Sequence, residues 1–264
     1  MPSGTLTRAS MVLEDMLSQD GRATSAAEIT RRTGIPKSSV HRLLEQLLTL
    51  GWIVREGNLY RLGAQMYDFG ISAARGDQAM AHAWPVLQDL AAHTRCVSYL
   101  GGLRGSKVAI LQKAVGPNRR APQFAVGARV PALRTSIGKV LVSAFPDAPE
   151  SLAARAEATS DRLRLRNELA HAQETGIAFG FDEAKPGLGC IASAIRVHGQ
   201  PIDVAIAVSG PAGAVRDRNV QQALRAAAAA IGRKLESTLP TDSSLRRSSP
   251  SVAVRIPQRT LHAV

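Results

Sequence analysis

Five hydrogen-bond donors stand close together in the stretch "GIPKSSVHRLLEQLLTLGW", residues 34–52, and they are Lys37, Ser38, Ser39, His41 and Arg42. Apolar residues recur at helical spacing from position 40 to position 48, so one face of a helix is expected to be buried. The donors then lie on the opposite face, in the first turns of that helix. Side chains there can reach base edges in the major groove, while the helix N-terminus favours phosphate. An ordinary solvated helix face is the alternative interpretation.

The elements before this helix favour the DNA-reading interpretation. A first helix is predicted over residues 5–18. Ser25 and Glu28 form a capping-box pattern at the start of a short helix, which Gly34 ends. Pro36 then suits the first turn of the helix that carries the donors, because its missing N–H costs nothing there.

The segment after the helix predicts a β-hairpin, because Gly57-Asn58 joins two short apolar runs. Three helices followed by a hairpin are the arrangement of a winged helix-turn-helix, with the hairpin as the wing. We expect DNA contacts from ten side chains in these elements, namely Ser25, Lys37, Ser38, Ser39, His41, Arg42, Gln46, Arg55, Asn58 and Arg61.

A second set of residues that could do chemistry includes Cys190, which follows a Gly-rich turn. A cysteine nucleophile would need a base, and the candidates by type are His93, His171 and His198. No spacing connects any of them with Cys190. Asp182 and Glu183 could join the histidines in a metal site, but their scatter matches no metal-ligand pattern. We therefore expect no catalytic residue, no metal and no cofactor.

The rest of the chain predicts a second, larger domain of the α+β class. Residues 64–80 suggest a linker helix, and another helix follows from about residue 81. Strands are predicted at 96–103, 107–114, 122–127, 189–198 and 202–209, with helices at 136–145, 161–175 and 215–237. Strands in runs, with helices grouped between them, indicate an antiparallel sheet. The expected divisions are a DNA-binding domain 1–63, a linker 64–80, a sensor-type domain 81–239 and a disordered tail 240–264.

Composition narrows the class of partners. The 264 residues carry a net charge of +12, which favours anionic ligands or polyanions. Residues 76–240 contain 20 basic and 13 acidic side chains, against 9 and 7 in residues 1–75, so most of the excess lies outside the DNA-binding segment. No apolar run is long enough for a membrane span, and two cysteines are too few for a disulfide framework. We expect a cytoplasmic protein with no membrane partner.

Several segments of the chain resemble IclR-type bacterial transcriptional regulators. The first half is similar in "TLTRASMVLEDML", "TSAAEITRRTGIPKSSVHRLLEQLLTLGWI" and "GNLYRLGAQMYDFG". The second half is similar in "VGARVPALRTSIGKVLVSAF", "DEAKPGLGCIASAI" and "AIAVSGPAG". The resemblance covers about residues 5–238, in the family's order. It implies a winged helix-turn-helix, a linker helix and a GAF-like effector-binding domain, assembled as homodimers or homotetramers.

The resemblance also implies a pocket for a small organic effector. The matching positions are Val130, Ser136, Ile137, Leu188, Cys190, Ala207 and Ser209, with Asp182 as a weaker candidate. Hydroxyls and N–H groups near residue 136 could hold a carboxylate, with apolar walls around the rest. The chain departs from the family at Gly189, where an Arg is frequent, and at Ala207, which lacks a hydroxyl seen in some members.

We therefore interpret the chain as a transcription factor that binds a double-stranded operator and responds to a small carboxylate. Two alternatives remain open. One is an orphan DNA-binding regulator whose second domain only oligomerises, and the other is an enzyme with an accessory DNA module.

Overall fold

The computed structural model describes residues 4–19, 21–117, 124–144, 159–181 and 186–238. The chain divides into two compact units, Met1–Gly76 and Asp77–Val264. No helix in the described ranges is both long enough and apolar enough to cross a membrane.

Unit 1 is a three-helix core with a small sheet and a fourth helix. Its elements are α1 (Thr5–Ser18), β1 (Thr24–Ser25), α2 (Ala26–Thr33), α3 (Lys37–Thr49), β2 (Ile53–Glu56), β3 (Leu59–Leu62) and α4 (Ala64–Arg75). The strands form an antiparallel sheet in the order β1-β3-β2. A cluster of buried side chains holds the helices and the hairpin together, and it includes Val12, Ile29, Val40, Leu44 and Ile53. The predicted winged helix-turn-helix is confirmed.

Local signals fix the boundaries in unit 1. Ser25 Oγ accepts a hydrogen bond from the Glu28 N–H at 3.3 Å, and the Glu28 carboxylate accepts from the Ser25 N–H at 2.9 Å, so the capping box is present. Gly34 ends α2 with φ 71°, a left-handed conformation that glycine adopts without strain. Helix α3 begins at Lys37, and Pro36, with φ −55° and ψ 140°, is its N-cap, one position before the first turn in which the sequence placed it.

Unit 2 is built on one six-stranded antiparallel sheet in the order β6-β5-β4-β9-β8-β7. The strands are β4 (Val97–Arg104), β5 (Lys107–Val115), β6 (Arg129–Pro131), β7 (Ile177–Phe181), β8 (Leu188–Val197) and β9 (Gln200–Pro211). The helices are α5 (Gln78–Thr94), η1 (Ala132–Arg134, a 3-10 turn), α6 (Ser136–Ser143), α8 (Thr159–Thr175), α9 (Ala212–Arg216) and α10 (Arg218–Thr238). The α+β class with an antiparallel sheet is therefore confirmed.

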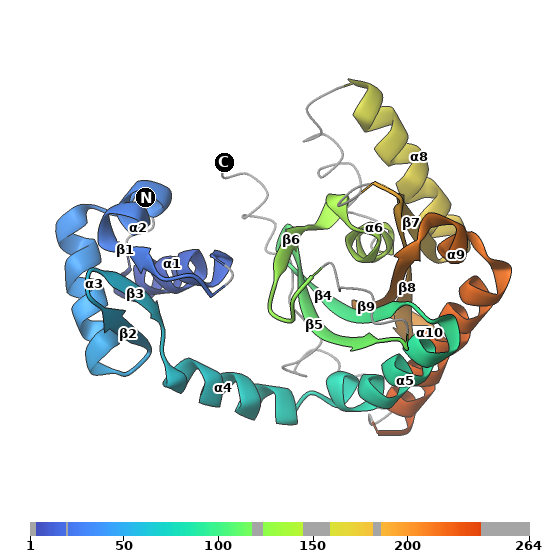
Figure 1. The fold of residues 1–264 in the computed structure, drawn as a ribbon, viewed down its shortest axis with the longest axis horizontal. Helices are drawn as coiled ribbons and strands as arrows, with labels where there is room; N and C mark the ends of the chain where they lie inside the picture. The colour runs from blue at the N-terminus through green and yellow to red at the C-terminus, as the bar shows by residue number, and fades with distance from the viewer. Residues whose placement is uncertain (1–3, 20, 118–123, 145–158, 182–185, 239–264) are drawn as a thin grey trace. The chain divides into compact units, whose positions relative to one another are not determined.

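Helices cover both faces of this sheet, as Figure 1 shows. Helices α5 and α10 pack on one face, where Leu87 and Leu224 are fully buried. Helices α6 and α8 cover the other face, where Leu141 and Leu169 belong to a second buried cluster. Every residue of α6 is buried, so this helix is enclosed between the sheet and the helices beside it.

Several expected elements differ from the structure. The helix expected over 64–80 is interrupted, because the Asp77 carboxylate accepts a hydrogen bond from the Met80 N–H at 3.2 Å and starts α5. No strand runs through the described part of 122–127, and β6 lies just after it. Strand β7 was missed, and Asp217 divides the helix expected over 215–237. The expected tail 240–264 lies outside the described residues.

Candidate nucleic-acid interface and ligand pocket

Helix α3 separates a buried face from a donor-rich exposed face. Val40, Leu43, Leu44 and Leu47 are buried in the core of unit 1. The exposed side chains are Lys37, Ser38, His41, Arg42 and Gln46, while Ser39 is half-buried. The structure therefore brings the predicted donors onto one accessible surface, as the helical spacing required.

The wing arginines are partly committed to contacts within the hairpin. Arg55 Nε donates to the Gly57 carbonyl at 2.8 Å, and its guanidinium lies 5.8 Å from the centre of the Tyr60 ring. Arg61 Nε lies 2.5 Å from a Glu56 carboxylate oxygen. Asn58 is exposed at the hairpin turn. Glu56 offsets the charge of Arg61, so the wing is less cationic than its arginines suggest.

Two polar residues, the N-cap Ser25 of α2 and Arg32 within that helix, hold unit 1 together. The Ser25 hydroxyl is engaged by the capping box, and a DNA contact from it stays a prediction. Arg32 makes a two-pronged pair with Asp15 of α1, at 2.7 and 2.9 Å, which was not predicted from the sequence.

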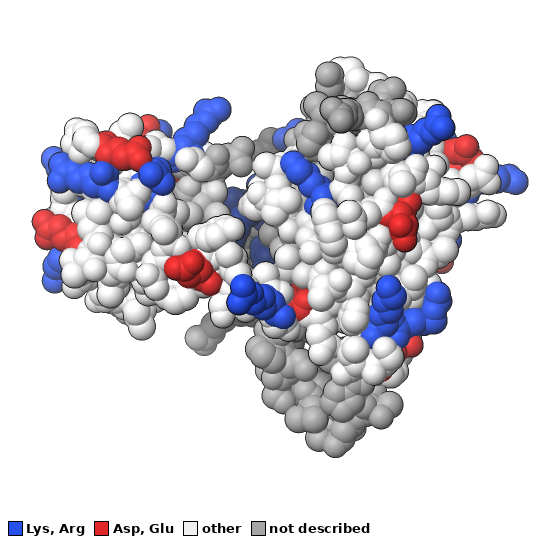
Figure 2. All heavy atoms as spheres, turned by 60° about the horizontal axis from the view of Figure 1, so that its bottom comes forward, with Lys and Arg blue, Asp and Glu red and all other residues white. Residues whose placement is uncertain are grey.

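Figure 2 shows Lys and Arg side chains gathered along one side of the unit drawn at the left, beside acidic ones.

A small cavity lies in unit 2 between the N-terminus of α6 and the strands β4, β7 and β8. Its volume is about 30 Å³. It is lined by Tyr99, Ile110, Phe124, Arg134, Thr135, Ser136, Ile137, Gly180, Leu188, Gly189 and Cys190. Aromatic and aliphatic side chains form most of the wall, while Arg134, Thr135 and Ser136 supply polar groups at one end.

Ser136 is the distinctive polar group of this cavity. Its side chain is 1% exposed, and its Oγ has no hydrogen-bond partner among the described residues. Thr135 is engaged differently, since its Oγ1 accepts from the Gly138 N–H at 3.0 Å and caps α6. A buried hydroxyl without a partner costs about 1–3 kcal/mol, and a ligand acceptor in the cavity would remove this cost.

Two contacts fix the position of α6. A Cβ on Gly138 would lie 2.0 Å from the Ala132 carbonyl oxygen, so only glycine allows the helix this close to η1. Lys139, which is 2% exposed, pairs with Glu168 of α8 at 2.7 Å. Burial alone would raise the pKa of Glu168, but hydrogen bonds from Lys139 and Arg164 outweigh it and lower that pKa.

The predicted effector residues fall into three groups. Four of them line the cavity, namely Ser136, Ile137, Leu188 and Cys190. Three do not line it but share its face of the sheet, because Val130 is opposite Val108, Ala207 opposite Tyr99 and Ser209 opposite Cys190. Asp182 lies outside the described residues. Whether any of them binds a ligand stays a prediction.

The aromatic part of the wall was not predicted from the sequence. Tyr99 and Phe124 meet edge to face, with ring centres 6.4 Å apart, and the Phe124 N–H donates to the Tyr99 hydroxyl at 3.5 Å. Strand alternation at 97–103 could have placed Tyr99 on the same face as Val97. No local signal connects it with Phe124 or Arg134, which tertiary packing brings to the cavity.

Gly189 has a packing reason. A Cβ there would lie 2.4 Å from Cγ2 of Val215, so a larger side chain would displace α9. The close packing of β8 against α9 therefore explains why glycine stands at position 189, where the family often has Arg.

The histidines considered as bases for Cys190 are not part of this cavity. His171 instead lies in a separate groove with Phe179, with ring centres 6.4 Å apart. Among the described residues, no group of three His, Cys, Asp or Glu side chains could hold a metal ion.

Comparisons with known proteins match both units. Residues 5–57 match the model of the IclR helix-turn-helix domain, and residues 73–235 match that of the bacterial transcriptional regulator IclR C-terminal region. The HTH-type transcriptional regulator XynR of Escherichia coli is 27% identical over 253 residues, which cover 88% of this chain and 96% of XynR. The acetate operon repressor of Salmonella typhimurium is 26% identical over 231 residues, covering 83% and 84%.

Solved structures show the same fold. An IclR-type regulator from a Silicibacter species superposes with a TM-score of 0.78 at 22% identity, covering 90% of this chain and 98% of that one. An IclR homologue from Microbacterium hydrocarbonoxydans, solved in complex with 4-hydroxybenzoate, has a TM-score of 0.73 at 22% identity, covering 89% and 100%.

Proposed function

Because this chain belongs to the IclR family of bacterial transcriptional regulators, we propose that it binds an operator through α3 and the β2–β3 hairpin and that a small organic acid in the α6 cavity changes this affinity. Members of the family are regulators rather than enzymes. We also propose that it acts in the cytoplasm, where its DNA lies. The observation that carries the DNA role is the exposed donor face of α3.

The chemistry of the cavity supports a carboxylate ligand. Arg134 supplies a cation, Ser136 an unpaired buried hydroxyl, and the α6 N-terminus a favourable dipole for an anion. Tyr99 and Phe124 offer an edge-to-face wall for a ring. One relative binds 4-hydroxybenzoate, and an aromatic acid of this kind is therefore our first candidate effector.

The size of the cavity supports a link between binding and conformation. Its volume of about 30 Å³ has room for roughly two water molecules. An aromatic acid needs several times this space, so it would bind a wider state of the cavity. A ligand shifts an equilibrium only by its difference in affinity for the two states. Widening here would move α6 or the segment before β6.

Self-association is proposed from α4. This helix has no buried residue, and two of its aromatic side chains are exposed, Tyr67 to 70% and Phe69 to 49%. A second copy of the chain that packs along this helix would also pair two recognition helices for a two-fold operator. Whether the assembly is a dimer or a tetramer follows from its mass in solution.

Operator binding is tested with Arg42→Ala. We would first sequence the DNA that the protein retains, and then measure affinity for the best site and for random DNA. A base contact is worth about 1–3 kcal/mol, so Arg42→Ala should weaken specific binding about 5- to 150-fold and affect random DNA much less. Arg75→Ala, an exposed arginine of α4, is the control and should leave the ratio of the two affinities unchanged. An equal loss on both DNAs would show that Arg42 contacts only phosphate.

The orphan-regulator alternative makes a different prediction for ligands. If the second unit only oligomerises, no organic acid will raise its melting temperature or change its affinity for the operator. A thermal-shift screen with 4-hydroxybenzoate, other aromatic acids and short aliphatic acids separates the two functions.

A further inference from the structure

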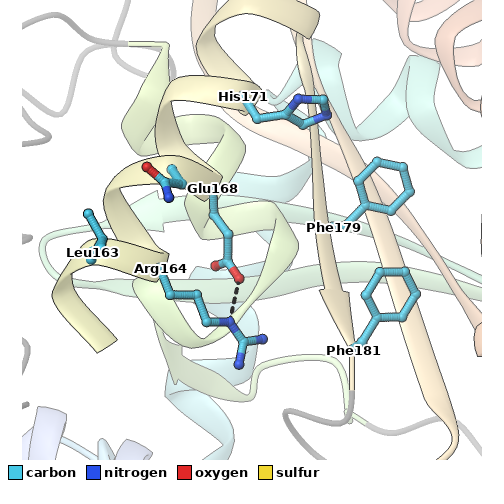
Figure 3. Close-up of a pocket in the computed structure, with 7 residues that line it drawn as sticks. Leu163, Arg164, Glu168, His171, Phe179 and Phe181 are labelled. Carbon is cyan, nitrogen blue, oxygen red and sulfur yellow. Dashed lines mark hydrogen bonds and ion pairs between the residues drawn. The ribbon is translucent and has the colours of Figure 1, made fainter. Parts of the chain in front are cut away.

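We propose that residues 251–256 of this chain bind as an added strand along the free edge of β7. The site is the β7 groove, an open groove of about 680 Å³ whose lining residues are Leu163, Arg164, Asn167, Glu168, His171, Phe179 and Phe181. Figure 3 shows His171, Phe179 and Phe181 in a row beside β7, with the Arg164–Glu168 pair on α8. The inference is independent of the proposed function, and it departs from the expectation that residues 240–264 form a disordered tail.

Strand β7 is the last strand of its sheet, and its backbone orientation can be worked out. Among the strands that the structure describes, its one neighbour is β8. On the other side, the Ile177 N–H donates to Thr175 Oγ1 at 3.3 Å, and the same hydroxyl lies 3.2 Å from the Ile177 carbonyl oxygen. Backbone groups of a strand alternate in direction, so those of Phe179 and Phe181 point to the same outer edge. At this edge, the Thr175 hydroxyl engages the backbone groups of Ile177 and not those of Phe179 or Phe181.

The side chains beside this edge are suited to a strand with one apolar face. Phe179 and Phe181 stack with ring centres 5.9 Å apart on the α9–α10 side of the sheet. Arg216 of α9 lies over Phe181, 4.4 Å from the ring centre. Polar side chains of α8 line the other side of the groove. An added strand would thus need apolar residues at every second position.

The C-terminal segment contains one run with this pattern. Residues 251–256 read SVAVRI, and Pro250 and Pro257 stand on either side of the run. Val252, Val254 and Ile256 occupy alternate positions and would share a face. β-Branched residues favour strands, and flanking prolines confine a strand to an edge position. The match to the family model ends at residue 235, so this run lies beyond the matched region.

The chain is long enough to reach the groove. Near the end of α10, the Glu236 carboxylate accepts from the His198 N–H at the turn after β8. From there Ile191, the partner of Phe179, is seven residues back along β8, or about 24 Å. Strand β7 lies one strand spacing, about 4.8 Å, further. Residues 239–250 can extend over about 40 Å, which exceeds this path.

Hydrogen exchange of the full chain tests the proposal. The amides of Phe179 and Phe181 should exchange at least about tenfold more slowly in the wild type than in Val254→Pro, because proline removes a ladder donor and disfavours the strand. Thr260→Pro places the same residue outside the run and should behave as the wild type. A chain that ends at residue 238 should match Val254→Pro.

Two results would overturn the proposal. One is equal exchange at Phe179 and Phe181 in all four proteins. The other is protection that persists in Val254→Pro but disappears on dilution, which would mean that a second copy of the chain, rather than residues 251–256, occupies the groove.

Discussion

Ser136 is buried in the α6 cavity, and its hydroxyl has no hydrogen-bond partner among the described residues. Removing this hydroxyl should therefore raise the stability of the ligand-free protein but lower its affinity for a carboxylate. Ser136→Ala should stabilise the ligand-free protein by up to about 1 kcal/mol, because the unsatisfied group is removed. The same change should weaken binding of a carboxylate about tenfold, because a hydrogen bond to a charged group is lost. Melting temperature and calorimetric titration measure the two effects.

Ser143→Ala is the control, since Ser143 is buried in the same helix but its hydroxyl already donates to the Val140 carbonyl at 3.0 Å. That variant should bind the acid as the wild type does. Unchanged ligand affinity in Ser136→Ala would remove this residue from the site.

The Lys139–Glu168 pair should make the stability of unit 2 dependent on pH. The folded-state pKa of Glu168 is lowered, so its stabilising contribution is present above the unfolded value of about 4.5 and is lost as the pH falls through the folded pKa. Glu168→Gln should cost about 2–3 kcal/mol at neutral pH, since the buried Lys139 then loses this carboxylate. The loss relative to wild type should shrink in acid.

Thermal melts across pH 3–7 check this dependence. Glu174→Gln, an exposed change on the same helix, should cost little at any pH. A constant difference between Glu168→Gln and wild type from neutral to acid pH would contradict the role given to the ion pair.

At the scale of elements, the closeness of α6 to η1 depends on Gly138. Gly138→Ala should destabilise the protein by about 1–3 kcal/mol, because the new Cβ meets the Ala132 carbonyl and the helix must shift. The shift should also weaken ligand binding, since Ser136 and Ile137 begin this helix. Gly213→Ala in α9 meets no atom within 4 Å and should be close to neutral. Equal melting temperatures for the two variants would show that α6 is not constrained by this contact.

Elements with local signals were predicted well from the sequence. The Ser25–Glu28 capping box, Gly34 and the Gly57-Asn58 turn each determine their own neighbourhood, and the structure confirms them. Strand β7 was missed because its five residues follow α8 directly and carry no alternation of apolar and polar side chains. The strand expected at 122–127 was wrong, since an apolar run alone does not show whether a neighbouring strand pairs with it.

Only some of the residues that line the cavity could be predicted from the sequence, because the others reach it through long-range contacts. Ser136 and Cys190 stand in recognisable segments, but Tyr99, Phe124 and Arg134 reach the cavity only through strand register and packing. Such long-range contacts leave no short-range pattern in one sequence.

In the whole molecule, an acid bound in unit 2 can change operator binding by unit 1 only if the two units are coupled. The covalent route between them runs through α4 and the Gly76–Asp77 break before α5. If an acid changes operator affinity by some factor, the operator must change affinity for the acid by the same factor. Typical couplings of 1–3 kcal/mol correspond to about 5- to 150-fold.

The most direct test of this account is operator affinity, measured by fluorescence anisotropy with and without a saturating acid selected by thermal shift. We predict at least about a fivefold change in Kd for the wild type. Ser136→Ala, at the same acid concentration, should show a smaller change while its affinity without acid stays near that of the wild type. An acid that binds the protein but leaves the operator Kd unchanged would contradict the central claim that the α6 cavity controls DNA binding.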